Sequence, residues 1–108
     1  MNIIMSLWSK PCTNGKAHGF SSIQSMIESI ILSANVIKKN HKEIHFYTDN
    51  KGYEWIKPHL NDLPFTKIEV CLDEINWLDD LYWSLGKMYV YSLQKEPFIH
   101  IDLSLIHI

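Results

Sequence analysis

The order of apolar and polar positions along the chain predicts strands that alternate with helices. Residues 2–8 (NIIMSLW) form a nearly continuous apolar run, which is typical of a strand buried on both faces. Residues 44–48 (IHFYT) are mostly β-branched or aromatic, and the polar residues at 49–52 that follow them predict a turn. Alternation over residues 66–72 predicts a third strand near a sheet edge, and residues 98–103 predict a fourth.

Two longer segments repeat apolar residues at helical spacing. The first stripe comprises Ile23, Ile27, Ile30, Ala34 and Ile37. Ser21 and Gln24 have the spacing of a capping box at the start of this predicted helix. The second stripe lies within residues 77–94, and a shorter helical piece over 53–60 is interrupted by Pro58.

This order of elements predicts an α/β fold. Strands joined by helix-length crossovers form right-handed units on a mostly parallel sheet, with helices on both faces. We therefore expect a partial Rossmann-like, three-layer α/β/α arrangement with a sheet of about four strands. Ligands of such open sheets bind outside the carboxyl ends of the strands, so the residues that follow each strand are the candidates for function.

Composition narrows the classes of partner. The chain has 108 residues, of which 46% are hydrophobic and 20% charged, so it suits one small globular domain. All ten basic residues are lysine and the net charge is −2, so nucleic acid is not an expected partner. Two widely spaced cysteines do not form a disulfide framework, and no apolar run has transmembrane length. We expect a cytoplasmic protein, with peripheral attachment to the inner membrane left open.

Polar residues gather at the predicted strand ends. They are Trp8, Ser9, Lys10, Thr48, Asp49, Asn50, Asp73, Glu74, His100 and Asp102. His100 and Asp102 are two residues apart on one predicted strand and therefore share a face. A carboxylate at such a position is solvated, paired or metal-bound, because burying it unpaired is costly. The alternative for any single one of these residues is an ordinary polar loop position.

The segment 85–102 resembles the helix and strand that lead into the Asp-x-Asp motif of GT-A glycosyltransferases, in a bacterial branch of that superfamily. The residues that carry the resemblance are the run from Leu85 to Tyr89 and the run from Pro97 to Asp102 (PFIHID). The resemblance implies a nucleotide-diphosphate sugar donor, Mn²⁺ or Mg²⁺, and a glycan or lipid-linked acceptor that the sequence does not identify.

The resemblance also implies roles for individual residues. Asp102 would contact the donor ribose or the metal ion, and Lys87 would approach the donor phosphate or sugar. The residues expected to line the rest of the donor pocket are Trp8, Ser9, Thr48, Asp49 and His100. The second carboxylate of the motif is expected at position 104, where this chain has Ser104. This departure opposes catalysis by the chain as written.

The last six residues, 103–108 (LSLIHI), resemble a translated sequencing adaptor. We therefore expect residues 1–102 to be the N-terminal, nucleotide-sugar-binding half of a GT-A domain, and 103–108 to be a non-native tail. The alternative for the tail is a short natural strand. The alternative for the function is a non-catalytic, Rossmann-like nucleotide-binding or interaction domain, for which Ser104 would be native.

Overall fold

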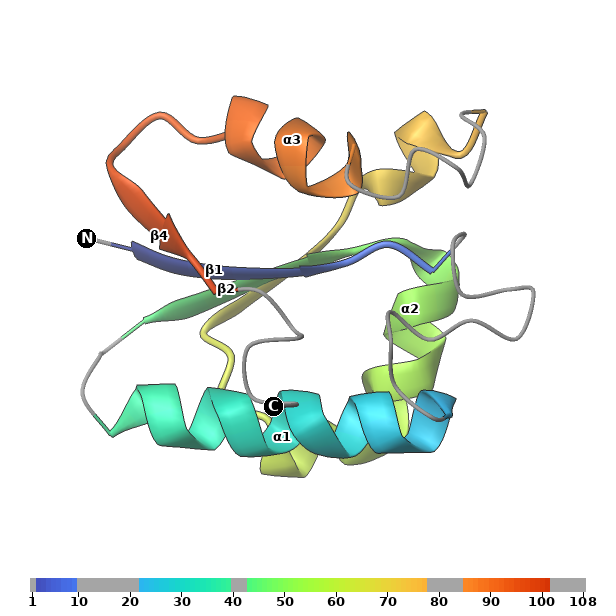
Figure 1. Ribbon diagram of the computed structural model, residues 1–108, viewed down its shortest axis with the longest axis vertical. Coiled ribbons are helices and arrows are strands. Elements are labelled where there is room, and N and C mark those ends of the chain that lie inside the picture. The colour runs from blue at the N-terminus through green and yellow to red at the C-terminus, as the bar shows by residue number, and fades with distance from the viewer. Residues whose placement is uncertain (1, 10–21, 40–42, 78–84, 102–108) are drawn as a thin grey trace.

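The computed structural model describes residues 2–9, 22–39, 43–77 and 85–101. Within these ranges the strands form one four-stranded sheet in the order β3-β2-β1-β4, and every pairing is parallel (Figure 1). The strands are β1 (Asn2–Leu7), β2 (Ile44–Thr48), β3 (Lys67–Val70) and β4 (Phe98–His100). The predicted α/β fold class and parallel sheet are confirmed, and the predicted edge position of the third strand is correct.

Helices cover both faces of this sheet. The α-helices are α1 (Ile23–Lys38), α2 (Asn50–Ile56) and α3 (Leu85–Ser92), and the 3₁₀ turns are η2 (Lys57–Asp62) and η3 (Leu72–Ile75). Figure 1 shows α1 and α3 on opposite sides of the strands, which gives three layers. Residues 78–84 of the second predicted helix lie outside the described residues.

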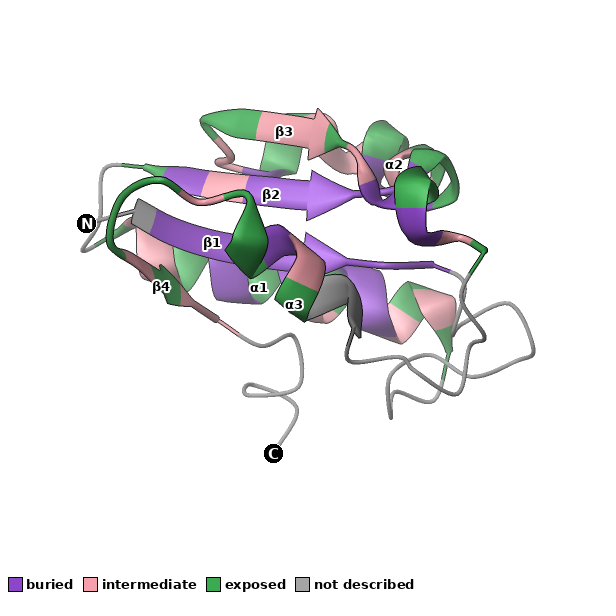
Figure 2. Ribbon diagram, turned by 90° about the horizontal axis from the view of Figure 1, so that it is seen from above, coloured by how far each residue is buried: buried purple, intermediate pink, exposed green. Residues whose placement is uncertain are grey.

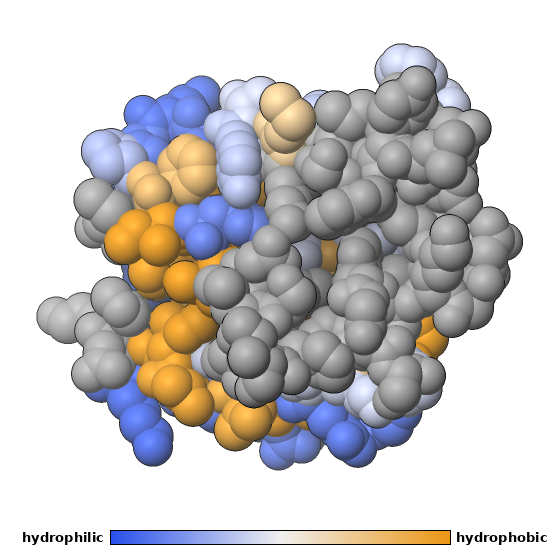
Figure 3. Space-filling model, in the orientation of Figure 1, coloured by the Kyte–Doolittle hydropathy of each residue, from blue (hydrophilic) through white to orange (hydrophobic). Residues whose placement is uncertain are grey.

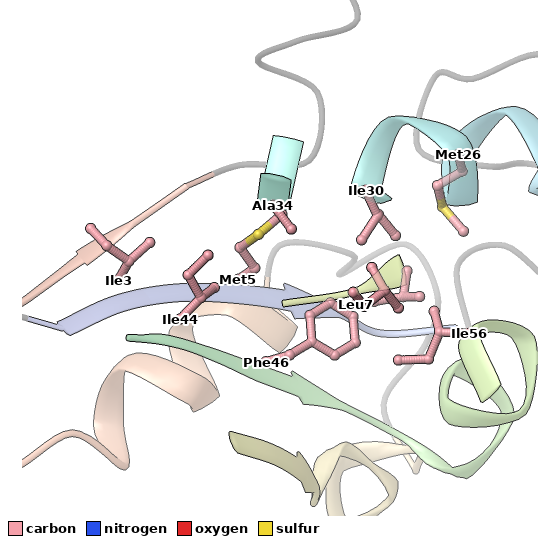
Figure 4. Packing of buried hydrophobic residues seen from close by; sticks show 10 residues of the cluster. Ile3, Met5, Leu7, Met26, Ile30, Ala34, Ile44, Phe46 and Ile56 are labelled. Atoms are coloured by element: carbon pink, nitrogen blue, oxygen red, sulfur yellow. The ribbon is translucent and has the colours of Figure 1, made fainter. Parts of the chain in front are cut away.

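Side chains that alternate along β1 enter two separate cores. Ile3, Met5 and Leu7 point toward α1 and pack with Ile30 and Phe46 of the first core (Figure 4). The second core lies on the opposite face and consists of Ile4, Trp8, Tyr47, Leu72, Ile75 and Val90. Figure 2 shows β1 and β2 largely buried, which explains why β1 is mostly apolar and β2 mostly β-branched or aromatic in sequence.

Two predicted boundaries were wrong at the residue level. The N-cap of α1 is Ser22 rather than Ser21, because the Ser22 Oγ accepts a hydrogen bond from the Ser25 N–H at 3.1 Å. The third strand is shorter than 66–72, because Leu72 turns into η3 and buries its side chain in the second core. Strand β4 ends at His100, and the predicted continuation from residue 102 lies outside the described residues.

The predicted turn at 49–52 is the start of a helix instead. Asp49 caps α2 by accepting a hydrogen bond from the Gly52 N–H, so the polar run continues the chain directly into helix. The predicted helical piece over 53–60 therefore begins earlier, at Asn50. It changes to 3₁₀ geometry at Lys57, and Pro58 lies in the first turn of η2, where its missing N–H is tolerated.

The two edges of the described sheet differ in polarity. On β3, Lys67 and Glu69 are exposed or half-buried and form an ion pair at 3.6 Å. On β4, Ile99 is 43% exposed, and Figure 3 shows hydrophobic residues gathered over β4 and the C-terminal end of α1. Within the described part of the chain, none of the helices has the length and apolar character needed to cross a bilayer.

Candidate functional site

The site suggested by the topology is the carboxyl edge of the sheet beside β1 and β4. From β1 the chain moves through β2 to β3 on one side, and then returns to place β4 on the other side of β1. The order of strands therefore reverses at β1. In open parallel sheets, the loops that follow the two neighbouring strands at such a reversal run to opposite sides of the sheet. The crevice between these loops, outside the carboxyl ends of the strands, is where ligands bind.

Asp49 ties the ends of β1 and β2 together. Its Oδ2 accepts hydrogen bonds from the Ser9 N–H at 3.1 Å and from the Ser9 Oγ at 2.5 Å, while its Oδ1 accepts from the Gly52 N–H at 2.8 Å. The side chain is almost completely buried, with Asp49 only 1% exposed. The expected convergence of Ser9 and Asp49 is present in the structure, and both carboxylate oxygens are occupied by protein donors.

Thr48 makes the next link between the same strands. Its Oγ1 donates to the Leu7 carbonyl at 2.7 Å, and the residue is completely buried. Gly52 lies directly against this contact, since a Cβ added there would stand 2.1 Å from the Thr48 Oγ1 and 2.9 Å from the Asp49 Oδ1. The absence of a side chain at position 52 is therefore required for α2 to start this close to the two strands.

A second set of hydrogen bonds joins the ends of β1, β2 and β3. The Trp8 Nε1–H donates to the Asn76 Oδ1 at 2.7 Å, and the Asn76 Nδ2 donates to the Asp73 Oδ1 at 2.9 Å. The Asn50 N–H donates to the Asp73 Oδ2 at 2.8 Å. We call these residues, Trp8, Asn50, Asp73 and Asn76, the carboxyl-edge network. Sequence reasoning missed Asn76; its signal was the three-residue spacing from Asp73, which suits one 3₁₀ turn.

His100 lies within the sheet, away from its carboxyl edge. Its Nε2 is 3.0 Å from the Oγ of Ser6 on β1, and Ser6 is only 8% exposed. The ring of Tyr91 meets the His100 ring edge-on, with 5.1 Å between ring centroids. Ser6 was also missed by sequence reasoning, although a polar residue inside an apolar strand is itself a signal of a buried hydrogen bond.

The structure leaves two expected donor contacts untested. Lys87 lies on α3, but its side chain is outside the described residues, as is all of Asp102. Among the residues that are described, no three His, Cys, Asp or Glu side chains are grouped so as to hold a metal ion. Asp102, the carboxylate expected to hold Mn²⁺ or Mg²⁺, is not among these residues. Every buried side-chain nitrogen and oxygen in the described ranges has a hydrogen-bond partner.

Two residues near η3, Cys71 and Tyr89, have raised pKa values. Burial, followed by the negative charges of Glu69, Glu74 and Asp73, raises the pKa of the Cys71 thiol to about 11. The Tyr89 Oη donates a hydrogen bond to the Glu74 Oε2, and this bond raises the pKa of Tyr89 to about 12. Cys71 is therefore a thiol at neutral pH, which opposes a nucleophilic role for it.

Comparison with known proteins places the chain in a family without assigning an activity. No curated protein matches the chain significantly, and no solved structure does so. The model of a family described as being of unknown function, DUF6734, matches residues 1–106. Because this match spans nearly the whole sequence, the chain belongs to the DUF6734 family.

Proposed function

We propose that this chain binds a nucleotide-diphosphate sugar at the carboxyl edge of its sheet, as the donor-binding half of a glycosyltransferase. The observation that carries the proposal is the reversal of strand order at β1 in an all-parallel sheet, with α1 and α3 on opposite faces. The resemblance of segment 85–102 to GT-A glycosyltransferases supports the same edge, because that segment leads to the end of β4.

In this proposal Ser9 and Asp49 hold the sheet in place at the site, and other residues contact the donor. Ser9 and Asp49 bond to each other, so they fix the end of β1 and leave donor binding to their neighbours. Lys87 and Asp102 are the proposed contacts, a cation for the diphosphate and a carboxylate for the ribose hydroxyls. A requirement for Mn²⁺ or Mg²⁺ stays a prediction that depends on Asp102, and the acceptor stays unidentified.

A second candidate is a non-catalytic nucleotide-binding domain. It is favoured by the internal pairing of Thr48 and Asp49, whose side chains already bond to Leu7 and Gly52. Both candidates use the same edge of the sheet. They differ in whether the sugar is transferred or hydrolysed, which is a measurement separate from binding.

Calorimetric titration of the full 108-residue chain tests the proposal. UDP-, GDP- and ADP-sugars are titrated with and without Mn²⁺, and at least one is expected to bind with a micromolar Kd. Asp102→Asn is expected to raise that Kd about tenfold, which corresponds to about 1.4 kcal/mol. Asp62→Asn is the matched control, because Asp62 is exposed in η2 before β3 begins.

Each outcome of this titration decides a specific point. If none of these sugars binds at millimolar concentration, the donor site is wrong. If one binds and Asp102→Asn binds equally well, the assignment of Asp102 is wrong. Release of free sugar or transfer to an added acceptor would favour the glycosyltransferase over the non-catalytic domain, and binding without either would favour the latter.

A further inference from the structure

Asn76 connects two strand ends through a single amide. Its Oδ1 accepts from the Trp8 Nε1–H and its Nδ2 donates to the Asp73 carboxylate. The orientation of the amide is determined by these partners, because an indole nitrogen only donates and an ionised carboxylate only accepts. A flipped amide would place two donors and two acceptors face to face. Asn76 is therefore held in one orientation by both neighbours.

The end of β1 is held from two sides. On the face of the second core, the indole of Trp8 is fixed by Asn76. At the next residue, the Ser9 N–H is fixed by the Asp49 Oδ2. These two consecutive anchors hold Trp8 and Ser9 at the exit of β1, the strand at which the order of strands reverses. In α/β nucleotide-binding folds the ligand lies beside this exit.

We propose that Asn76, held by Asp73, is a positioning residue for the nucleotide site. It fixes the Trp8 indole and thereby the exit of β1 from which the donor-binding edge is built. This inference rests on the proposed function and adds Asp73 of η3 and the adjacent Asn76 to the site. Both residues follow β3, whereas the crevice lies beside β1 and β4. Asp73 contributes by orienting the amide and by accepting the Asn50 N–H at the start of α2.

An exchange of the two side chains tests this arrangement. Asn76→Asp keeps an oxygen for the indole but places a carboxylate against the carboxylate of Asp73, and we expect it to weaken nucleotide binding about tenfold. The double variant Asp73→Asn with Asn76→Asp restores complementary donors and acceptors at unchanged net charge. It can satisfy the Trp8 and Asn50 N–H groups again, so we expect its Kd to return to within about twofold of the original.

The titrations use the nucleotide sugar that the original chain binds and a temperature at which every variant is folded. Asn35→Ala is the matched control, because the Asn35 side chain also makes two hydrogen bonds but lies on α1. Its Nδ2 donates to the carbonyls of Ile31 and Asp62. This substitution should lower stability without changing the Kd. The indole N–H resonance of Trp8, followed by NMR, reports the anchoring of the ring independently of nucleotide.

The possible results separate the two proposals. Loss of binding in Asn76→Asp, with a changed Trp8 resonance and with rescue of both in the double variant, supports positioning. Unchanged binding in folded Asn76→Asp overturns it and leaves the donor site standing. Absence of rescue in a folded double variant also overturns it. If the original chain binds no nucleotide sugar, the proposed function fails, and the positioning role fails with it.

Discussion

At the scale of single residues, Asp49 shows how a candidate site residue serves the fold. The sequence predicted a polar residue at the end of a strand, and the structure places it there with both oxygens bound to protein donors. A sequence does not reveal this use, because the partners Ser9 and Gly52 are supplied by another strand and by the first turn of α2. Through its buried carboxylate, Asp49 connects β1, β2 and α2.

Removing this carboxylate should destabilise the protein strongly. Asp49→Ala leaves the Ser9 N–H, the Ser9 Oγ and the Gly52 N–H without their acceptor, and we expect a loss of about 3 kcal/mol in the free energy of unfolding. Asp49→Asn should lose less, because one oxygen remains. Urea denaturation measures both, with exposed Asp62→Ala as control. A loss below about 0.5 kcal/mol in Asp49→Ala would contradict the structural role.

A side chain at position 52 should also be poorly tolerated. In Gly52→Ala the new Cβ would meet the Thr48 Oγ1 at 2.1 Å, and that hydroxyl is already bound to the Leu7 carbonyl. We expect a destabilisation of about 2 kcal/mol, as for other overpacked sites. Glu54→Ala on the same helix is exposed and should change stability by less than about 0.5 kcal/mol. Equal effects of the two substitutions in urea denaturation would refute the close approach.

At the scale of elements, the periodicity of apolar residues predicted which segments are strands and helices, but not the residues at which they begin and end. The run 2–8 and the α1 stripe are correct because burial on both faces of β1 and on one face of α1 leaves a long apolar pattern. The start of α2 was missed because aspartate serves turns and N-caps through the same short side-chain acceptor. Which of two adjacent serines caps α1 depends on backbone geometry, which the sequence does not show.

The choice between those serines is testable. Ser22→Ala removes the acceptor of the Ser25 N–H and should lower the free energy of unfolding by about 1 kcal/mol. Ser21→Ala should change it by less than about 0.5 kcal/mol, since Ser22 already supplies the cap. Thermal and urea denaturation of the two single variants give the comparison. A larger loss from Ser21→Ala than from Ser22→Ala would reverse the assignment.

The hydrogen bond from Tyr89 to Glu74, which joins α3 to η3, should be lost at high pH. The hydrogen bond to Glu74 raises the pKa of Tyr89 to about 12, above the ordinary value of 10. A raised pKa in the folded state means that this stabilisation is complete below pH 10 and is lost as pH rises through 12. In Glu74→Gln the pKa of Tyr89 should fall toward 10, measured from the ring carbon shifts by NMR.

Glu54→Gln removes the same charge from α2 and serves as the control for that titration. The pKa of Tyr89 should remain about 12 in this control, because the hydrogen bond from Tyr89 goes to Glu74. A Tyr89 that titrates alike in Glu74→Gln and in the original chain would show that another group causes the shift.

At the scale of the whole molecule, the fold was predictable and the site only in outline. Alternating strands and helices predicted the parallel three-layer arrangement, because right-handed crossovers allow few alternatives. The same reasoning predicted a candidate site at the carboxyl edge. The carboxyl-edge network was not, because Trp8 and Asn76 come from distant segments and their hydrogen bond depends on the packing of the second core.

The most direct test of the central claim is an NMR titration of the ¹⁵N-labelled chain with the nucleotide-diphosphate sugar that binds best. A donor site at the carboxyl edge predicts saturable shifts in the amides that follow β1 and β2, including Ser9 and Asn50. Amides at the opposite edge of the sheet, where the strands begin, should keep their chemical shifts; examples are Ile44 and Lys67. Shifts confined to that opposite edge, or no saturable shifts at millimolar ligand, would contradict the claim.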